Sequence, residues 1–364
     1  MKDLIRIVSR NLDTILCWFL LVLPPYLAVY GGLHPPDGLG HAADFAIFRT
    51  AAEIVRSGQG DKLYDIDTQK RFYFKITEHR YPVFLVWNHH PAEALLYLPT
   101  VFATYETGLF VMRITNIILM CSFITWVAWR LRANSGHLFL LWVVLMIGTR
   151  SFACAIQGGQ DSIWILLFVV LGLVAASEGK PRCSGILLVL ASIKFTIVLP
   201  LMGILLLARF CKVVWYSAAV GVALMFVAMA VFGAEILPSY LTLCVALTSI
   251  RDNFGMYPAL LRNFRGMLMR WFPGSTNAMA LSAGCGALYA LVCTQIQRPY
   301  VLPLALFGAT FFSPHVFLHD TVMYVGSAAV WLVIWQSARA AVPSTVGTCE
   351  CGNSSTDSGR QCNP

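Results

Sequence analysis

Residues 184–203 read SGILLVLASIKFTIVLPLMG, an apolar run in which Lys194 is the one charged residue. A helix needs about 20 mostly apolar residues to cross the ~30 Å hydrocarbon layer of a membrane. Backbone N–H and C=O groups in lipid must be hydrogen-bonded within the segment, so such a run forms a helix and not an isolated strand. The stretch therefore predicts an all-α integral membrane protein.

The rest of the chain has the same character. Of its 364 residues, 58% are hydrophobic and 12% are charged, and the mean hydropathy is +0.69. We expect a polytopic domain over residues 1–338 with about 9–11 transmembrane helices, and a disordered polar tail over 339–364. The apolar runs cover residues 14–30, 84–104, 107–129, 137–156, 161–177, 184–208, 212–232, 236–250, 277–296, 299–313 and 320–338.

Basic residues lie at the ends of these runs, which is typical of loops retained on the cytoplasmic side. The formal net charge of +8 is spread in this way over many loops, so we expect no nucleic-acid partner. The first run has basic residues before it and no small-residue cleavage site after it, which predicts an uncleaved anchor with a cytoplasmic N-terminus. The loop over residues 31–82 would then face outward.

Two runs conflict with this topology. If residues 84–104 cross the membrane once, residues 107–129 must cross back, and Arg130 would lie outside. The run 184–208 has basic residues at both ends, which can share one side only if the chain turns back near Lys194. The sequence leaves open whether a segment is re-entrant or the charge rule fails locally.

The stretch ADFAIFRTAAEIVRSGQGDKLYD, residues 43–65, concentrates charges directly after the first run. Apolar residues recur at spacings of three and four, with Arg49 among the polar residues between them, so we expect an amphipathic helix lying in the membrane interface. Asp44 would lie at its N-terminal end. A carboxylate there could accept a proton from a sugar hydroxyl, or it could simply cap the helix, and the spacing does not decide.

His89 and His90 follow a short apolar run and stand beside Glu93. Paired histidines near a carboxylate could bind a metal. Adjacent helical residues point about 100° apart, however, and we recognise no partner four residues along. Hydrogen bonding to a polar substrate is therefore the favoured interpretation, with an ordinary turn before a span as the alternative.

Gln160 and Asp161 lie between two apolar runs, where polar groups usually face a cavity because lipid would leave them unpaired. Lys194 has no charged neighbour in sequence, and a lysine at the centre of an inserted helix costs about 2.5–3.5 kcal/mol. A phosphate is a natural counter-ion. An ion pair with Asp161 or Asp320 is the alternative.

The segment FFSPHVFLHDTVMY contains Ser313, His315, His319 and Asp320. The two histidines are four residues apart and are expected to share one helical face behind Pro314. That spacing also suits a metal, but no HExxH-like carboxylate lies between them. We favour contact with a substrate.

Taken in order, these motifs resemble those of family 87 glycosyltransferases, polytopic GT-C enzymes that use polyprenyl-phosphate sugars. The likeness covers about residues 40–325, and it departs from the family pattern at several motif positions. Its motifs are ADFAIFRTAAEIVRSGQGDKLYD, HHPAEALLYLP, QGGQD, ASIKFTIVLPL and SPHVFLHD, which stand in the family's order.

The resemblance implies that Asp44 is the catalytic base of the first extracytoplasmic loop and that Lys194 lies near the donor phosphate. It places Gln160, Ser313 and His319 in the sugar pocket. The wider substrate-binding set that we expect is Lys194, Gln160, Asp161, His89, His90, Arg49, Ser313, His315, His319 and Asp320.

The implied reaction is inverting transfer of a sugar, mannose by default, from a polyprenyl phosphate to a glycolipid or glycan acceptor. It would occur on the extracytoplasmic face of a bacterial inner membrane, with membrane lipid as the remaining partner. We recognise no metal-binding DxD motif, so no cofactor and no metal are expected. The alternative is a transporter or flippase of lipid-linked sugars, which would show related halves with broken spans.

Overall fold

The computed structural model describes residues 20–34, 43–81, 83–132, 134–249, 260–272 and 277–341. Every regular element in these ranges is a helix, which confirms the all-α polytopic class. The α-helices are α2 (Leu23–Leu33), α3 (Ala43–Arg56), α4 (Ile66–Thr77), α5 (Pro91–Tyr97), α6 (Tyr105–Leu131), α7 (Ser135–Gln157), α8 (Ser162–Ser177), α9 (Pro181–Leu190), α10 (Phe195–Leu207), α11 (Cys211–Phe232), α12 (Ile236–Ser249), α13 (Phe264–Trp271), α14 (Ala278–Cys293), α15 (Val301–Phe311) and α16 (Val322–Ala341).

In the described residues, four short 3₁₀ helices lie where the chain turns. They are η1 (Gly60–Lys62), η2 (Leu98–Phe102), η3 (Ala191–Lys194) and η5 (His319–Thr321). Helix α16 continues to Ala341, and the remainder of the expected polar tail, with its three cysteines, lies outside the described residues. The same holds for residues 250–259 and 273–276 of the second polar loop.

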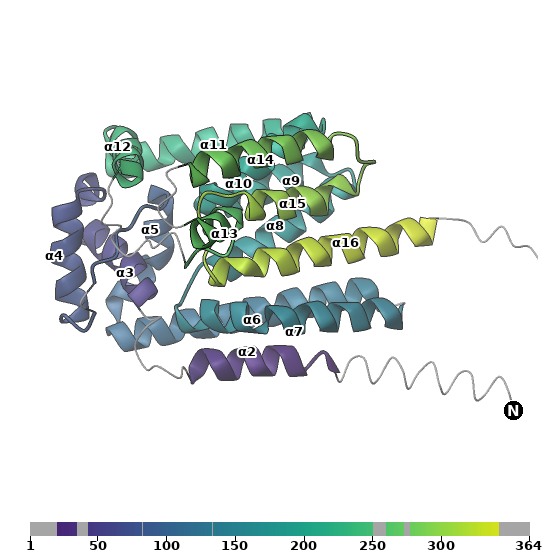
Figure 1. The fold of residues 1–364 in the computed structure, drawn as a ribbon. Helices are drawn as coiled ribbons and strands as arrows, with labels where there is room; N and C mark the ends of the chain where they lie inside the picture. The colour runs from purple at the N-terminus through teal and green to yellow at the C-terminus, as the bar shows by residue number, and fades with distance from the viewer. Residues whose placement is uncertain are drawn as a thin grey trace, which may run out of the picture.

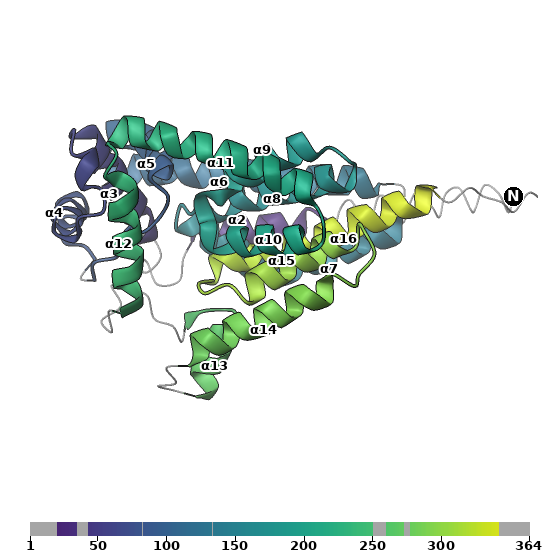
Figure 2. The same cartoon turned by 90° about the horizontal axis from the view of Figure 1, so that it is seen from above.

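The helices form a bundle with a cap at one end. Figure 1 shows α6, α7, α8, α11 and α16 running along the bundle, while α3, α4 and α5 gather at one end. We call α3–α5 with η1 and η2 the cap, and we call the opposite end of the bundle the basic end. Figure 2 shows α12 crossing the cap end at a steep angle to the bundle.

Each part has its own apolar core. The bundle core draws on α6, α7, α8, α10, α15 and α16, whereas the cap core contains large aromatic side chains such as Phe48, Trp87 and Tyr97. The ring of Phe48 stacks on that of Tyr97 with 4.5 Å between centroids, which joins α3 to α5. The cap is therefore a packed unit of protein and not a loose loop.

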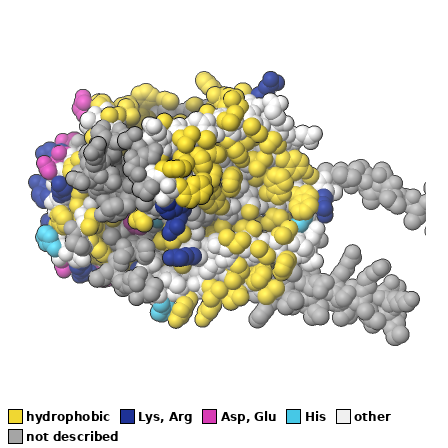
Figure 3. Space-filling model, viewed as in Figure 1, with side chains coloured by type: hydrophobic (Ala, Val, Ile, Leu, Met, Phe, Trp, Pro, Cys, Tyr) yellow, Lys and Arg dark blue, Asp and Glu magenta, His cyan; other side chains and the backbone are white. Residues whose placement is uncertain are grey.

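Five helical segments are long and apolar enough to cross a membrane: Tyr105–Leu131, Ser135–Gln157, Pro181–Leu207, Cys211–Phe232 and His319–Arg339. Shorter apolar helices accompany them. Figure 3 shows hydrophobic side chains over the bundle, and charged side chains gathered over the cap. This distribution is that of an integral membrane protein, because lipid-facing side chains must be apolar.

The prediction that residues 84–104 form one span is wrong. Residues 83–90 are irregular, and they are followed by the seven-residue helix α5 and then by η2. The run is apolar because Trp87, Tyr97 and Val101 fill the cap core. Helix α6 consequently begins at the cap, and its far end places Arg130 at the basic end, where it pairs with Glu178 at 2.7 Å. One of the two topological conflicts is thereby removed.

The run 184–208 turns back at Lys194. Helices α9 and α10 meet at η3, and each is only about 15–20 Å long at 1.5 Å per residue. The Arg182 guanidinium donates to the Tyr216 hydroxyl at 3.1 Å, and Tyr216 lies in the second turn of α11, the helix that directly follows α10. A straight helix of 27 residues would separate Arg182 from the start of α11 by about 40 Å. The segment is therefore a re-entrant hairpin, although its length and composition alone suit a single span.

This hairpin predicts that both ends of the segment are accessible from one side of the membrane. We expect Arg182→Cys and Arg209→Cys, each in a background without native cysteines, to react with an impermeant maleimide from the same side of sealed vesicles. Glu78→Cys in the cap should react from the other side. Labelling of the two hairpin positions from opposite sides would contradict the turn at Lys194.

Helix α3 forms as its periodicity predicts, and it ends at Arg56 before Gly58, whose φ of +75° suits glycine. Its apolar face was expected to lie against the membrane interface, and this expectation is wrong. Phe45, Phe48 and Ile54 are fully buried against protein in the cap core and do not face lipid. Burial against α4 and α5 thus holds the helix in one orientation.

Candidate active site

The side chain of Lys194 is buried at the tip of the hairpin, at the cap end of the bundle. Its Nζ forms a short ion pair with Asp320 and lies 3.6 Å from Asp161 Oδ1. Ser162 Oγ is 3.4 Å from the same nitrogen. The ion-pair alternative from the sequence is therefore present, and it involves both of the expected carboxylates.

Asp320 is fixed by several donors. Ser162 donates its hydroxyl to Oδ1 at 2.7 Å, and the backbone N–H of Phe317 donates to Oδ2 at 3.1 Å. His319 Nε2 lies 3.4 Å from Oδ1. A buried carboxylate with this many partners stays charged, because each hydrogen bond favours the anion. Asp320 therefore holds the Lys194 ammonium in place.

The QGGQD turn between α7 and α8 presents Gln160 and Asp161. The Tyr97 hydroxyl donates to the Gly159 carbonyl at 3.2 Å, and Asn116 Nδ2 donates to the Gln160 carbonyl at 2.8 Å. Arg113 donates to the Gln157 carbonyl at 2.9 Å. These bonds from α5 and α6 close the turn and direct Asp161 to Lys194.

Sequence reasoning missed these three supports. Arg113 and Asn116 lie inside the apolar run 107–129, where a polar residue needs a partner within the protein. Their positions could therefore have indicated that they contact a polar group of another segment. Tyr97 gave no signal, because an aromatic residue in an apolar run is ordinary. Ser162 was missed for a similar reason, as it sits at the first position of α8.

His89 and Glu93 form a second pair beside the first cluster. His89 Nδ1 lies 2.8 Å from Glu93 Oε2, so Glu93 is the partner at four residues that the sequence analysis failed to recognise. Burial works to lower the pKa of His89, but the Glu93 carboxylate outweighs burial and the pKa is raised. Burial raises the pKa of Glu93 to about 8, and the charge of Asp161 adds to the effect. Glu93 and Asp161 therefore interact directly.

His90 has a local structural role. Its Nδ1 accepts the N–H of Ala92 at 3.2 Å, so His90 is the N-cap of α5, and Pro91 follows at the first helical position. Burial lowers the pKa of His90. The ring of His90 thus follows His89 in the chain, and its Nδ1 is used in a hydrogen bond with the backbone.

The expectation that His315 and His319 share a helical face is wrong. Residues 313–318 are irregular, and only His319 enters the 3₁₀ helix η5. Ser313 Oγ donates to the Thr196 carbonyl at 2.9 Å and ties this loop to α10. The His315 ring meets Phe317 edge to face at 4.5 Å, and burial lowers the pKa of His315 to about 3, so the ring is neutral at physiological pH.

Asp44 lies in the first turn of α3 and is partly exposed. Because α3 begins at Ala43, Asp44 is not the residue before the helix, as the capping alternative required. Burial raises the pKa of Tyr97 far above its usual value, and the charges of Asp161, Glu93 and Asp44 act in the same direction. Tyr97 thus lies within electrostatic range both of Asp44 and of the buried carboxylates.

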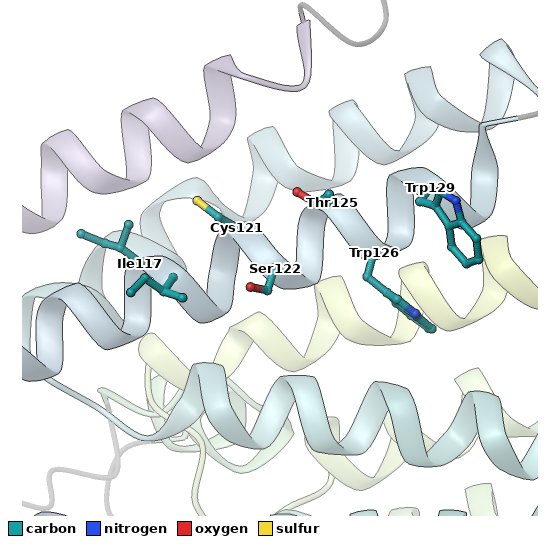
Figure 4. A pocket seen from close by; sticks show the side chains of 7 residues that line it. Ile117, Cys121, Ser122, Thr125, Trp126 and Trp129 are labelled. Atoms are coloured by element: carbon teal, nitrogen blue, oxygen red, sulfur yellow. The ribbon is translucent and has the colours of Figure 1, made fainter.

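Arg49 lies away from this cluster. Its guanidinium donates to the carbonyls of Thr100, Ala103 and Thr104 at 2.6–2.9 Å, which anchors the end of η2 to α3. Arg49 also lines a charged cleft of about 420 Å³ on the cap, together with Glu53, Arg56, Lys75, Glu78, Arg80 and Glu106 among others. A second hollow, of about 610 Å³, is a groove along α6 with Cys121, Ser122 and Thr125 in it and Trp126 and Trp129 at one end (Figure 4). Neither hollow is lined by Asp44 or Lys194.

The cluster joins elements that are far apart in sequence: the hairpin tip, the start of α8, the loop before α5 and the start of α16. A buried ammonium among carboxylates, imidazoles and amides is a polar site at the end of a membrane bundle. The family model for glycosyltransferase family 87 matches residues 87–318. The chain therefore belongs to glycosyltransferase family 87. Comparison with curated proteins and with solved structures found no match.

The matched residues contain most of the candidate site. Lys194, Asp161 and His89 lie inside the match, whereas Asp44 precedes it and His319 and Asp320 are the first two residues after it. The family assignment thus establishes a membrane glycosyltransferase. The particular roles of the site residues rest on the geometry.

Proposed function

We propose that this protein moves a sugar, mannose in the first instance, from a polyprenyl-phosphate donor to a hydroxyl of a glycolipid or glycan acceptor. The observation that carries the proposal is the buried ammonium of Lys194, held at the tip of a re-entrant hairpin by Asp161 and Asp320. A lipid-linked donor has its phosphate at the membrane surface, where the cap end of the bundle would lie.

Lys194 supplies positive charge for the donor phosphate. An ammonium has three N–H donors, and its contacts with Asp161 and Ser162 are long, at 3.6 and 3.4 Å. Donor capacity therefore remains for a phosphate oxygen. A fixed cation costs no reorganisation when negative charge builds up on the leaving phosphate, which is how preorganised groups lower a barrier.

Asp44 serves as the general base. The acceptor oxygen attacks the anomeric carbon, its proton passes to the Asp44 carboxylate, and the bond from that carbon to the phosphate oxygen breaks. The phosphate leaves with the electron pair, and the configuration at the anomeric carbon inverts. Asp44 is partly exposed at the cap, which leaves it open to an acceptor arriving from water.

The charge distribution supports an extracytoplasmic site. The loops of the basic end hold one acidic residue, Glu178, among the described residues. Basic residues predominate there, as expected of a cytoplasmic side: Arg130, Arg132, Lys180, Arg182, Arg209, Lys212, Arg298 and Arg339. The cap, with Asp44, would then face outward, and a bacterial inner membrane would place it in the periplasm.

The proposal is tested with membrane vesicles that contain or lack the protein and receive a radiolabelled polyprenyl-phosphate mannose. We expect label to appear in a new glycosidic product only when the protein is present, with inverted anomeric configuration by NMR. Matching glucose and galactose donors test the sugar. Movement of label across sealed vesicles without any new glycosidic bond would indicate a transporter and would overturn the proposal.

A further inference from the structure

Three potential ligand groups converge beside Lys194. His89 comes from the loop before α5, Glu93 from α5 and Asp161 from the turn before α8, and one ligand atom of each lies within 4.8 Å of the others. Glu93 is fully buried and Asp161 is 3% exposed. The three groups thus come from two distant parts of the chain and meet inside the protein.

The carboxyl groups of this cluster have few partners. Among the described residues, no donor reaches the four oxygens of Glu93 and Asp161 with good hydrogen-bond geometry; the nearest nitrogens are His89 Nδ1, 2.8 Å from Glu93 Oε2, and Lys194 Nζ, 3.6 Å from Asp161 Oδ1. An unsatisfied buried acceptor costs about 1–3 kcal/mol, and more when it is charged. Two such carboxyl groups side by side would be satisfied by a bound cation or by a shared proton.

The neighbouring side chains supply little positive charge to Glu93 and Asp161. Lys194 makes its shortest contact with Asp320 and a longer one with Asp161, and Asp320 brings a third carboxylate into the cluster. His319 and His315 face the same group of charges from η5 and its preceding loop, and burial keeps His315 neutral. The cluster therefore brings three carboxyl groups, those of Glu93, Asp161 and Asp320, together with the one ammonium of Lys194.

We propose that His89, Glu93 and Asp161 bind one divalent transition-metal cation of the Mn²⁺ or Zn²⁺ kind. An imidazole nitrogen with two carboxylate oxygens suits these ions, whereas Mg²⁺ and Ca²⁺ prefer oxygen ligands alone. Binding would turn His89 Nδ1 from its contact with Glu93 to the metal. The sequence analysis expected no metal, because Asp161 is 68 residues from Glu93 in the chain and no spacing motif joins them.

Three protein ligands leave coordination positions open, as in metal sites that also bind a substrate. Asp161 lies between the cation and Lys194, so a phosphate oxygen held by Lys194 would be close to an open position. This part of the inference rests on the proposed function, whereas the metal site itself does not.

The test uses full-length protein in detergent, stripped with a chelator and titrated with Mn²⁺ alone, with free Mn²⁺ followed by EPR. We expect one equivalent to bind, and Glu93→Gln and Asp161→Asn each to weaken binding at least about 10-fold. His89→Gln should do the same. Glu78→Gln, which removes an exposed carboxylate of the cap, is the matched control and should bind as the wild type does.

Gel filtration and thermal unfolding show whether each variant is folded. Absence of Mn²⁺ binding by the wild type, and of Zn²⁺ binding in a parallel titration, each at about 100 µM metal, would overturn the proposal, as would unchanged binding by folded Glu93→Gln and Asp161→Asn. In that case the two carboxyl groups share a proton instead. Because no donor sugar is present, failure here is separate from failure of the proposed transfer reaction.

Discussion

Asp44→Asn is expected to lower glycosyl transfer by about 10²–10⁴-fold, which is the usual contribution of a general base. The amide keeps the size of the carboxylate but cannot accept the proton of the acceptor hydroxyl. The side chain of Asp44 accepts no hydrogen bond from a described residue, so the fold should tolerate the change. The measurement is kcat/KM with a labelled polyprenyl-phosphate sugar.

The matched control is Asp61→Asn, which changes an exposed aspartate of η1 in the same loop. We expect it to keep normal turnover. If Asp44→Asn also turns over normally at an unchanged protein level, another group is the base. His89, which is paired with Glu93 in the same cap, would then be the next residue to examine.

Lys194→Met is expected to abolish transfer and to destabilise the protein. Removing the ammonium leaves Asp320, and Asp161 beside it, buried without a cation, and breaking a buried ion pair costs about 3–5 kcal/mol. Thermal unfolding in detergent should therefore shift downward together with the loss of activity. This single variant does not separate the two effects.

The double variant Lys194→Met/Asp320→Asn separates them. Neutralising Asp320 removes the main unpaired charge, so stability should recover in large part while transfer stays absent. Lys194→Arg should keep the ion pair and some activity, because a guanidinium is charged but larger and planar. Recovery of transfer in the double variant would show that Lys194 is structural only.

Local patterns of sequence were sufficient for the fold class and for part of the site. Twenty-residue apolar runs require helices in lipid, and the three-to-four spacing around Ala51 required α3. A lone Lys194 in such a run required a buried counter-charge, and the two named candidates are the two that it meets. These inferences hold because each depends on residues within one segment or on the high cost of an unpaired charge.

Other properties depended on what each segment packs against. The hydropathy of residues 84–104 indicates that they are buried away from water, but burial in the cap core gives the same pattern as burial in lipid. The number of spans and the side of the membrane on which Arg130 lies could therefore not be predicted from the local sequence. Proline at position 314 and the loop after it kept His315 off the turn that holds His319. An apolar segment is a membrane span or part of a protein core according to what it packs against, and its composition alone does not distinguish the two.

The sequence by itself thus determined that the protein is a helical membrane protein and that α3 is amphipathic with Asp44 in its first turn. It also determined that the charge of Lys194 needs a partner within the protein. Only the tertiary structure decided that the hairpin turns back at that lysine, and that Asp161, Asp320 and the His89–Glu93 pair meet around it. The reason is physical: helix formation follows from neighbours within a few residues, whereas ion pairs and ligand groups form between residues that packing alone brings together.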